Sequence, residues 1–281
     1  MSNPNKPDAT PRLLIAGFGD LGQRLVPLVP RDWAVHALKR GPTATSYRAL
    51  NIIQADLTRA QSLAVVDTHW DAVVYTATPD KRTPEAYRAS YVDGLRNLLD
   101  RIDTKRLLMV SSTAVYGQDQ GEWVDEQSPT DPSSFTGDML LEAEHLAQRR
   151  GGIVVRFSGI YGPGRTRLID HVQQGGVRCQ RHPPIWTNRI HADDCARGLA
   201  HLLLLESPES LYLASDDEPS PRWDVYHWLA EQMHVRGPIE AHGQVNQLGK
   251  RVRNTRLSNS GFRLRYRHFR AGYSELLMDY P

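Results

Sequence analysis

The sequence has little cysteine, little net charge and no long apolar run. Its two cysteines, Cys179 and Cys195, cannot form a disulfide scaffold and lack the CxxC spacing of a zinc site. No run of about 18 apolar residues is present, so the sequence contains no candidate membrane-spanning helix. The net charge of +2 is too small for a chain whose main task is to coat nucleic acid or an anionic membrane. We therefore expect a protein of a reducing, cytoplasmic compartment with neither kind of partner and no bound metal.

The remaining composition is that of a globular protein. Hydrophobic residues make up 40% of the 281 residues and charged residues 23%, which argues against wholesale disorder. Residues 1–11 are polar, contain three prolines and lack the apolar core of a signal peptide. We expect this segment to be a flexible lead outside the folded core.

Short apolar runs alternate with segments of helical length over the first two-thirds of the chain. Unbroken apolar strands are typical of a parallel sheet that is covered on both faces. Repeated strand and helix predict a doubly wound α/β fold of the Rossmann type. The expected strands are Leu13–Ala16, Ala34–Leu38, Asn51–Ala55, Ala72–Thr76, Leu107–Ser111 and Ile153–Phe157. The main expected helices are Pro84–Ile102 and Gly137–Arg150.

The alternation stops after about residue 160, where glycine and proline pairs indicate loops. We expect a dinucleotide-binding domain over residues 12–160, which segment 189–214 rejoins. A smaller substrate lobe would comprise residues 161–188 and 215–281. Its last part is expected to hold one helix, near Asp224–Met233, followed by a polar tail.

A glycine-rich loop, Gly17–Gly22, follows the first expected strand and opens a helix. This context makes a GxGxxG pattern informative. Gly17 would permit the tight turn, Gly19 would let a diphosphate approach the backbone, and Gly22 would let helix and strand pack closely. The free amides at the helix start favour an anion. The loop predicts a dinucleotide site; a tight turn without a ligand is the alternative. The predicted cofactor contacts in this loop are Gly17, Phe18, Gly19, Asp20, Leu21 and Gly22.

The end of the second strand bears on the choice between NAD and NADP. An NAD site needs an acidic residue about 20 residues after the loop, and none lies there. Lys39 and Arg40 stand there instead and could pair with the 2′-phosphate of NADP, although basic residues at a strand end are often only solvated. The interpretation favours NADP over NAD. Asp56, after the third strand, could bind the adenine amino group or could simply stabilise a turn.

Several motifs together resemble the extended short-chain dehydrogenase/reductase family, in its NAD-dependent epimerase/dehydratase group. The resemblance covers residues 12–280 and implies a Rossmann domain with a C-terminal substrate lobe. It also implies a nucleotide-sugar substrate, as for many members. The motifs are Gly17–Gly22, Asp56-Leu57, Tyr91–Leu99, Ser111–Gly117, Arg156 with Tyr161–Gly164, and Arg189–Asp194. Further cofactor contacts expected from this reading are Asp56, Leu57, Thr76, Ala77 and Tyr161.

The resemblance fails where the family's catalytic residues are expected. The family uses a Tyr-x-x-x-Lys pair, whose lysine lowers the pKa of the tyrosine, together with a Ser or Thr hydroxyl. Ser112 matches the hydroxyl position and is the main candidate catalytic residue, with Tyr91 and Asp138 as further candidates for a proton carrier. Alignment on Glu144 puts Thr136 at the tyrosine position and Leu140 at the lysine position, and none of the five lysines follows a tyrosine by four residues. The family's asparagine is replaced by Tyr91.

This departure leaves two functions open. The first is an oxidoreductase- or epimerase-like enzyme with a degenerate active site, which acts on a nucleotide sugar or another small carbonyl or hydroxyl compound. The second is a non-catalytic NADP(H)-binding sensor or regulatory protein. The resemblance also implies that a homodimer could form through the helices near residues 85–101 and 138–150.

Three other features have plain structural explanations. Tyr161 and Arg165 are four apart, but Gly-Pro-Gly between them predicts a loop and not a helical pair. Asp193 or Asp194 is expected to cap the following helix, in preference to binding a metal. The basic residues between Lys250 and Arg270 are expected mainly to form a solvated face, with an anionic ligand or nucleic acid as alternatives.

Overall fold

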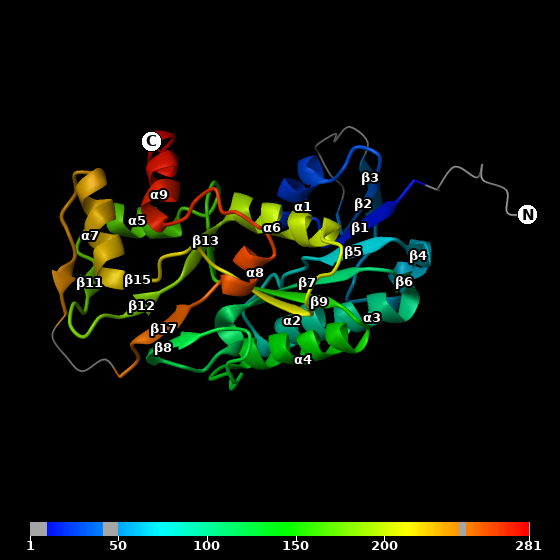
Figure 1. Ribbon diagram of the computed structural model, residues 1–281, viewed down its shortest axis with the longest axis horizontal. Coiled ribbons are helices and arrows are strands. Elements are labelled where there is room, and N and C mark those ends of the chain that lie inside the picture. The colour runs from blue at the N-terminus through cyan, green and yellow to red at the C-terminus, as the bar shows by residue number, and fades with distance from the viewer. Residues whose placement is uncertain (1–9, 42–49, 242–245, 281) are drawn as a thin grey trace, which may run out of the picture.

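The computed structural model describes residues 10–41, 50–241 and 246–280. Most of the expected N-terminal lead, residues 1–9, lies outside the described residues. The molecule is elongated, with the central sheet in one half and a lobe containing α5 (Arg167–Gln173), α7 (Arg222–Gln232) and α9 (Phe269–Met278) in the other (Figure 1).

A seven-stranded sheet forms the centre of the larger half. All neighbouring strands in it pair in parallel. From one edge to the other the strands are β14 (Leu211–Ala214), β9 (Ile153–Phe157), β7 (Leu107–Ser112), β5 (Ala72–Tyr75), β1 (Arg12–Ala16), β2 (Ala34–Lys39) and β3 (Leu50–Gln54). The strand order reverses direction between β1 and β5, which is the point where doubly wound sheets bind ligands. The predicted fold class is confirmed.

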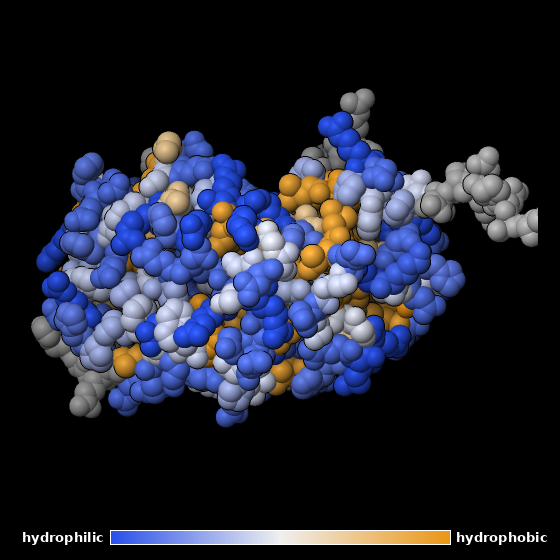
Figure 2. All heavy atoms as spheres, viewed as in Figure 1, coloured by the Kyte–Doolittle hydropathy of each residue, from blue (hydrophilic) through white to orange (hydrophobic). Residues whose placement is uncertain are grey.

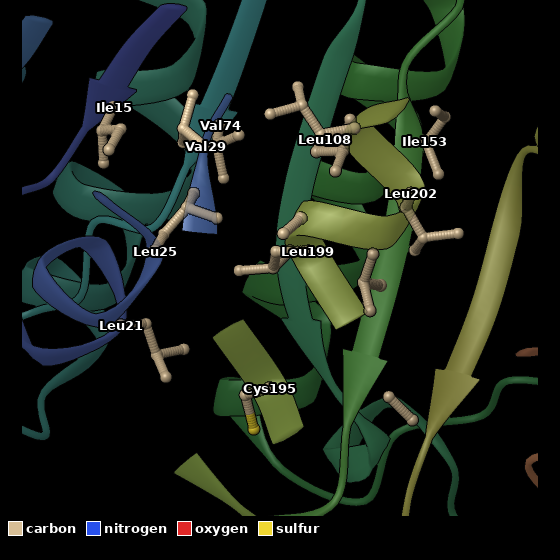
Figure 3. Close-up of a cluster of buried hydrophobic side chains, with 14 of the residues drawn as sticks. Ile15, Leu21, Leu25, Val29, Val74, Leu108, Ile153, Cys195, Leu199 and Leu202 are labelled. Atoms are coloured by element: carbon tan, nitrogen blue, oxygen red, sulfur yellow. The ribbon is translucent and has the colours of Figure 1, made fainter. Parts of the chain in front are cut away.

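Helices cover both faces of the sheet. One face carries α1 (Asp20–Leu25), continued by the short helix η1 (Val26–Leu28), and α6 (Ala192–Leu204). Their apolar side chains meet those of β1, β7 and β9 in one buried cluster (Figure 3). The other face carries α3 (Gly94–Arg101) and α4 (Phe135–Arg149), which pack over a second cluster (Figure 1). The use of α3 and α4 for a homodimer stays a prediction.

The expected helix Pro84–Ile102 is divided into three segments. It consists of α2 (Pro84–Tyr87), a π-helical turn η3 (Arg88–Asp93) and α3. The Tyr75 hydroxyl, from the sheet below, donates a hydrogen bond to the Ser90 carbonyl at 2.5 Å. This bond ties the wider turn to the sheet.

Short pairings build the smaller lobe and join it to the sheet domain. β10 (Gly159–Tyr161) pairs with β13 (Arg189–His191), and β8 (Gln120–Val124) pairs with β17 (Gly249–Val252). The remaining short strands are β4 (His69–Trp70), β6 (Asp103–Thr104), β11 (Arg178–Cys179), β12 (Trp186–Thr187), β15 (Ser220–Pro221) and β16 (Ile239–Glu240). The remaining short helices are η2 (Ala60–Val65), η4 (Thr113–Val115) and α8 (Thr255–Asn259).

The prediction of a polar C-terminal tail is wrong. Residues 249–278 form β17, α8 and α9, and the buried rings of Phe269 and Tyr273 join a third apolar cluster with α5 and α7. Basic residues are frequent in this segment, but the rings that stand between them, such as Tyr266, were already expected to pack under the tail, and they are buried. Arginines of the segment form ion pairs with carboxylates: Arg265 with Glu275, Arg267 with Asp217, and Arg270 with Glu218.

The surface is predominantly hydrophilic on the face drawn in Figure 2, and the largest orange group lies over the region of α1. Within the described residues, no helix is both long enough and apolar enough to span a membrane.

Candidate functional site

The glycine loop is built as a sharp turn between β1 and α1. Gly17 has a φ of +98°, and a Cβ at this position would lie 2.4 Å from the backbone nitrogen of Ala77. A Cβ on Gly22 would lie 3.0 Å from Ile15, so this glycine allows the helix to pack on the strand. A Cβ on Gly19, in contrast, would meet no atom within 4 Å. Gly19 therefore borders open space that a ligand can occupy.

A cleft of about 370 Å³ lies at the carboxyl ends of β1, β2, β3 and β5. Nine of the predicted cofactor contacts line it, namely Gly17, Phe18, Gly19, Lys39, Arg40, Asp56, Leu57, Thr76 and Ala77. Sequence reasoning missed other lining residues: Leu38, Gly41, Ala55, Thr58, Thr78, Asp80 and Ser90. The geometry thus brings most of the predicted set together, while their contact with a cofactor stays a prediction.

Four predicted contacts do not line this cleft. Leu21 and Gly22 are buried in the packing of α1. Asp20 forms ion pairs with Arg24 at 2.7 Å and with Arg165 at 2.9 Å. Burial alone would raise the pKa of Asp20, but the hydrogen bonds from these two arginines outweigh burial and hold it below its ordinary value. The fourth, Tyr161, lies in the smaller lobe.

Asp56 stabilises a turn, which is one of the two roles that the sequence left open. Its Oδ1 accepts hydrogen bonds from the amide and the hydroxyl of Thr58, at 3.0 and 2.8 Å. This is the turn geometry typical of aspartate. The same residue lines the cleft, so a ligand contact through its other oxygen stays a prediction.

Two basic side chains stand at the rim of the cleft, where β2 ends. Lys39 has no ion-pair partner within the described residues. Arg40 faces Asp80, which follows β5 on the opposite wall, and their side chains form two hydrogen bonds of 2.5 and 2.6 Å. The carboxylate of Asp80 raises the pKa of Arg40, and Arg40 in turn lowers the pKa of Asp80.

The predicted catalytic position lies at the end of β7. Ser112 is half-buried, and its Oγ accepts a hydrogen bond from the amide of Ala114 at 3.2 Å, which caps η4. Thr136, on α4, is buried, and its hydroxyl is 2.8 Å from that of Ser134. Leu140, one turn further along α4, is 3% exposed. It belongs to an apolar cluster with Val115, Tyr116, Val124, Leu213 and Val252.

A buried polar network lies next to the end of β7, where Ser112 stands. Arg156 donates to Glu144 with contacts of 2.6 to 3.1 Å, and both side chains are at least 95% buried. Arg156 also donates to the hydroxyl of Tyr116 at 2.6 Å, and Ser111 donates to Glu144 at 2.5 Å. The network joins β7, β9 and α4 and fixes the strand end that carries Ser112.

A profile of the NAD-dependent epimerase/dehydratase family matches residues 13–212. The chain belongs to this family. A search of curated proteins finds no match.

Solved structures of similar fold cover nearly the whole chain. A protein from Methylobacillus flagellatus, assigned to the NAD-dependent epimerase/dehydratases, is 36% identical, with a TM-score of 0.80 over 96% of this chain and 99% of that one. A conserved protein of unknown function from Silicibacter pomeroyi is 29% identical, with a TM-score of 0.73 and the same coverage. MoeE5, in complex with UDP-glucose and NAD, is 22% identical, with a TM-score of 0.75 over 94% of this chain and 96% of that one.

Membership of the epimerase/dehydratase family makes the environment of Leu140 informative. Tyr91, at the expected asparagine position, packs against the cluster that contains Leu140. Burial raises the pKa of Tyr91 to about 12, so its phenol is a poor proton donor near neutral pH.

The ammonium group of Lys250, on β17, donates a hydrogen bond to the carbonyl of Tyr116, and burial lowers the pKa of Lys250. Sequence reasoning missed this amine because the approach of β17 to β8 is a tertiary pairing.

Tyr161 and Arg165 do not share a helix, and neither residue lines the glycine-loop cleft. Tyr161 is 4% exposed, packs against Tyr273 with ring centroids 4.5 Å apart, and has no hydrogen-bond partner for its hydroxyl among the described residues. It lines a second cavity of about 660 Å³ in the smaller lobe, together with Arg167 and Arg189. Arg165 also lines this cavity, but its guanidinium group donates to Asp20 at 2.9 Å and not to the hydroxyl of Tyr161.

The prediction that Asp193 or Asp194 caps α6 is wrong. The cap is His191, whose Nδ1 accepts from the amide of Asp193 at 3.2 Å. Asp193 pairs with Arg24 at 2.6 Å, and buried Asp194 accepts backbone hydrogen bonds from residues 265 and 266. Both carboxylates are occupied by segments distant in sequence, which no local pattern reveals. Over residues 10–41, 50–241 and 246–280, no group of three metal-ligating side chains converges.

Proposed function

We propose that the chain is an NADP(H)-binding, oxidoreductase- or epimerase-like protein with a degenerate active site. The open space above Gly19, inside a cleft lined by nine expected contacts, carries this proposal. The glycine-loop amides would hold the diphosphate, and residues 56–57 and 76–77 would border the adenosine. Lys39 and Arg40 would pair with the 2′-phosphate. When bound, the nicotinamide supplies a hydride acceptor or donor.

The proposal predicts that NADPH binds at least about tenfold tighter than NADH, because charge-assisted hydrogen bonds to a phosphate are strong. Fluorescence titration of both dinucleotides measures the ratio. Equal dissociation constants would remove the NADP preference but leave dinucleotide binding intact.

Substitution of Gly19 tests the cleft itself. Gly19→Ala adds a methyl group where no protein atom lies within 4 Å, so we expect an unchanged or slightly higher unfolding midpoint. The same methyl group would obstruct the approach of a diphosphate and weaken NADPH binding by at least about tenfold. A variant that unfolds like the parent and binds NADPH equally well would contradict the placement of the diphosphate.

A nucleotide sugar, or another small carbonyl or hydroxyl compound, is the proposed substrate. The binding of UDP-glucose and NAD by MoeE5 supports the first choice. The cavity of about 660 Å³ in the smaller lobe offers Arg167 and Arg189 to an anionic substrate, and the Nη1 of Arg189 has no hydrogen-bond partner among the described residues. Ser112 would donate a hydrogen bond to the reacting oxygen. Ser112→Ala should then lower kcat without changing the dissociation constant of NADPH.

A non-catalytic sensor is the second candidate, and the environment of Leu140 favours it. Leu140, at the predicted lysine position, belongs to an apolar cluster, and Thr136, at the predicted tyrosine position, offers a hydroxyl far less acidic than a phenol. Turnover separates the two functions. Stoichiometric NADPH binding without oxidation, across a panel of nucleotide sugars and carbonyl compounds, would support the sensor; substrate-dependent oxidation would support the enzyme.

A further inference from the structure

Arg40 and Asp80 connect the two walls of the glycine-loop cleft at its rim. Arg40 directly follows β2, Asp80 follows β5, and both residues line the cleft. Nη1 and Nη2 of the guanidinium group bind the two carboxylate oxygens at 2.5 and 2.6 Å. Both side chains are more than half exposed, so bulk water and salt can weaken this pair.

The bidentate pair engages the same donors that a phosphate would use. A guanidinium group recognises carboxylate and phosphate through the same planar fork of N–H donors. While the Arg40–Asp80 pair is formed, the carboxylate neutralises the charge of Arg40 and occupies its Nη1 and Nη2 donors. Lys39 has no such competitor within the described part of the chain.

We propose that Asp80 is a specificity-determining residue: it competes with the 2′-phosphate of the cofactor for Arg40 and so limits the preference for NADPH over NADH. This inference rests on the proposed dinucleotide function and adds the residue that tunes it. NADH, which carries a 2′-hydroxyl and not a phosphate, leaves the Arg40–Asp80 pair intact. NADPH has to displace Asp80 before Arg40 can bind its phosphate with both terminal nitrogens.

Titration of NADPH and NADH against the full chain and four variants tests the inference. The variants are Asp80→Asn, Arg40→Ala, the double variant and Asp100→Asn. Asp100 is the matched control, because it forms a comparably exposed ion pair with Arg150 at 3.0 Å outside the cleft. Its substitution changes the net charge by the same amount as Asp80→Asn.

We expect Asp80→Asn to bind NADPH about threefold tighter, the size of an exposed ion pair, with unchanged NADH affinity. The gain should vanish when Arg40 is alanine, and Asp100→Asn should change neither constant. A gain that persists without Arg40 would mean direct repulsion between Asp80 and the phosphate and would overturn the competition. An unchanged NADPH to NADH ratio would also overturn it. Failure of the parent chain to bind either dinucleotide would instead overturn the proposed function.

Discussion

Replacement of Leu140 by lysine tests whether the position predicted for the family's lysine is an empty site or part of the core. Leu140 is 3% exposed and packs with Val115, Tyr116, Val124 and other apolar residues. Leu140→Lys removes these contacts and places an ammonium group among aliphatic and aromatic atoms. A buried charge without a partner costs more than the lost packing alone.

The expected cost is on the order of 3 kcal/mol or more of unfolding free energy, since truncation of a buried leucine alone costs about 2–5 kcal/mol. Leu140→Met is the control and should cost less than about 1.5 kcal/mol, because it conserves volume and polarity. Burial would hold the pKa of the introduced amine below its ordinary value of about 10.4. The unfolded chain then binds more protons than the native chain, so the deficit of Leu140→Lys should shrink as the pH rises toward about 10.

Urea denaturation of the parent and both variants, at several pH values, gives these free energies. A Leu140→Lys chain as stable as Leu140→Met, with no dependence of the deficit on pH, would refute the assignment of Leu140 to the core. It would mean that the introduced amine reaches solvent or the cofactor cleft. Thr136→Tyr combined with Leu140→Lys would then be expected to tighten NADPH binding.

Three further predictions concern stability. Glu144→Gln leaves Arg156 buried without its charged partner and should lower the unfolding free energy by about 3 kcal/mol in urea titration; a loss below about 1 kcal/mol would contradict a buried pair. Burial raises the pKa of Asp216 to about 8. The native chain therefore binds the extra proton between about pH 4 and 8, and its unfolding free energy should fall across that window. Asp216→Asn should flatten this fall of the unfolding free energy with pH. An equal slope in the parent and the variant would refute the raised pKa of Asp216. Gly17→Ala should lower the midpoint of thermal unfolding, because a Cβ would lie 2.4 Å from Ala77; an unchanged midpoint would contradict the tight turn.

Several strands of the central sheet were predictable because they are unbroken apolar runs. Strand β5, Ala72–Tyr75, for example, lies within the predicted run Ala72–Thr76. A parallel strand buried on both faces needs a continuous apolar stretch, so the sequence alone locates it. The glycine loop was predictable because its GxGxxG spacing follows directly on an apolar strand and opens a helix.

Features made by tertiary contacts were not predictable. Asp80 meets Arg40 across the cleft, and Lys250 reaches Tyr116 through a pairing of strands more than 100 residues apart. The cap of α6 is His191 because the helix begins at Ala192, so both aspartates lie in its first turn and their carboxylates bind distant segments. In each case the deciding partner is far along the chain, so local residue type and spacing carry no signal.

A crystal structure of the chain grown with NADPH tests the central claim most directly. We predict density for the diphosphate against Gly19 and for the 2′-phosphate beside Lys39 and Arg40, with Leu140 still enclosed by its apolar neighbours. An empty cleft at saturating NADPH would contradict the account. So would a dinucleotide that binds elsewhere on the molecule.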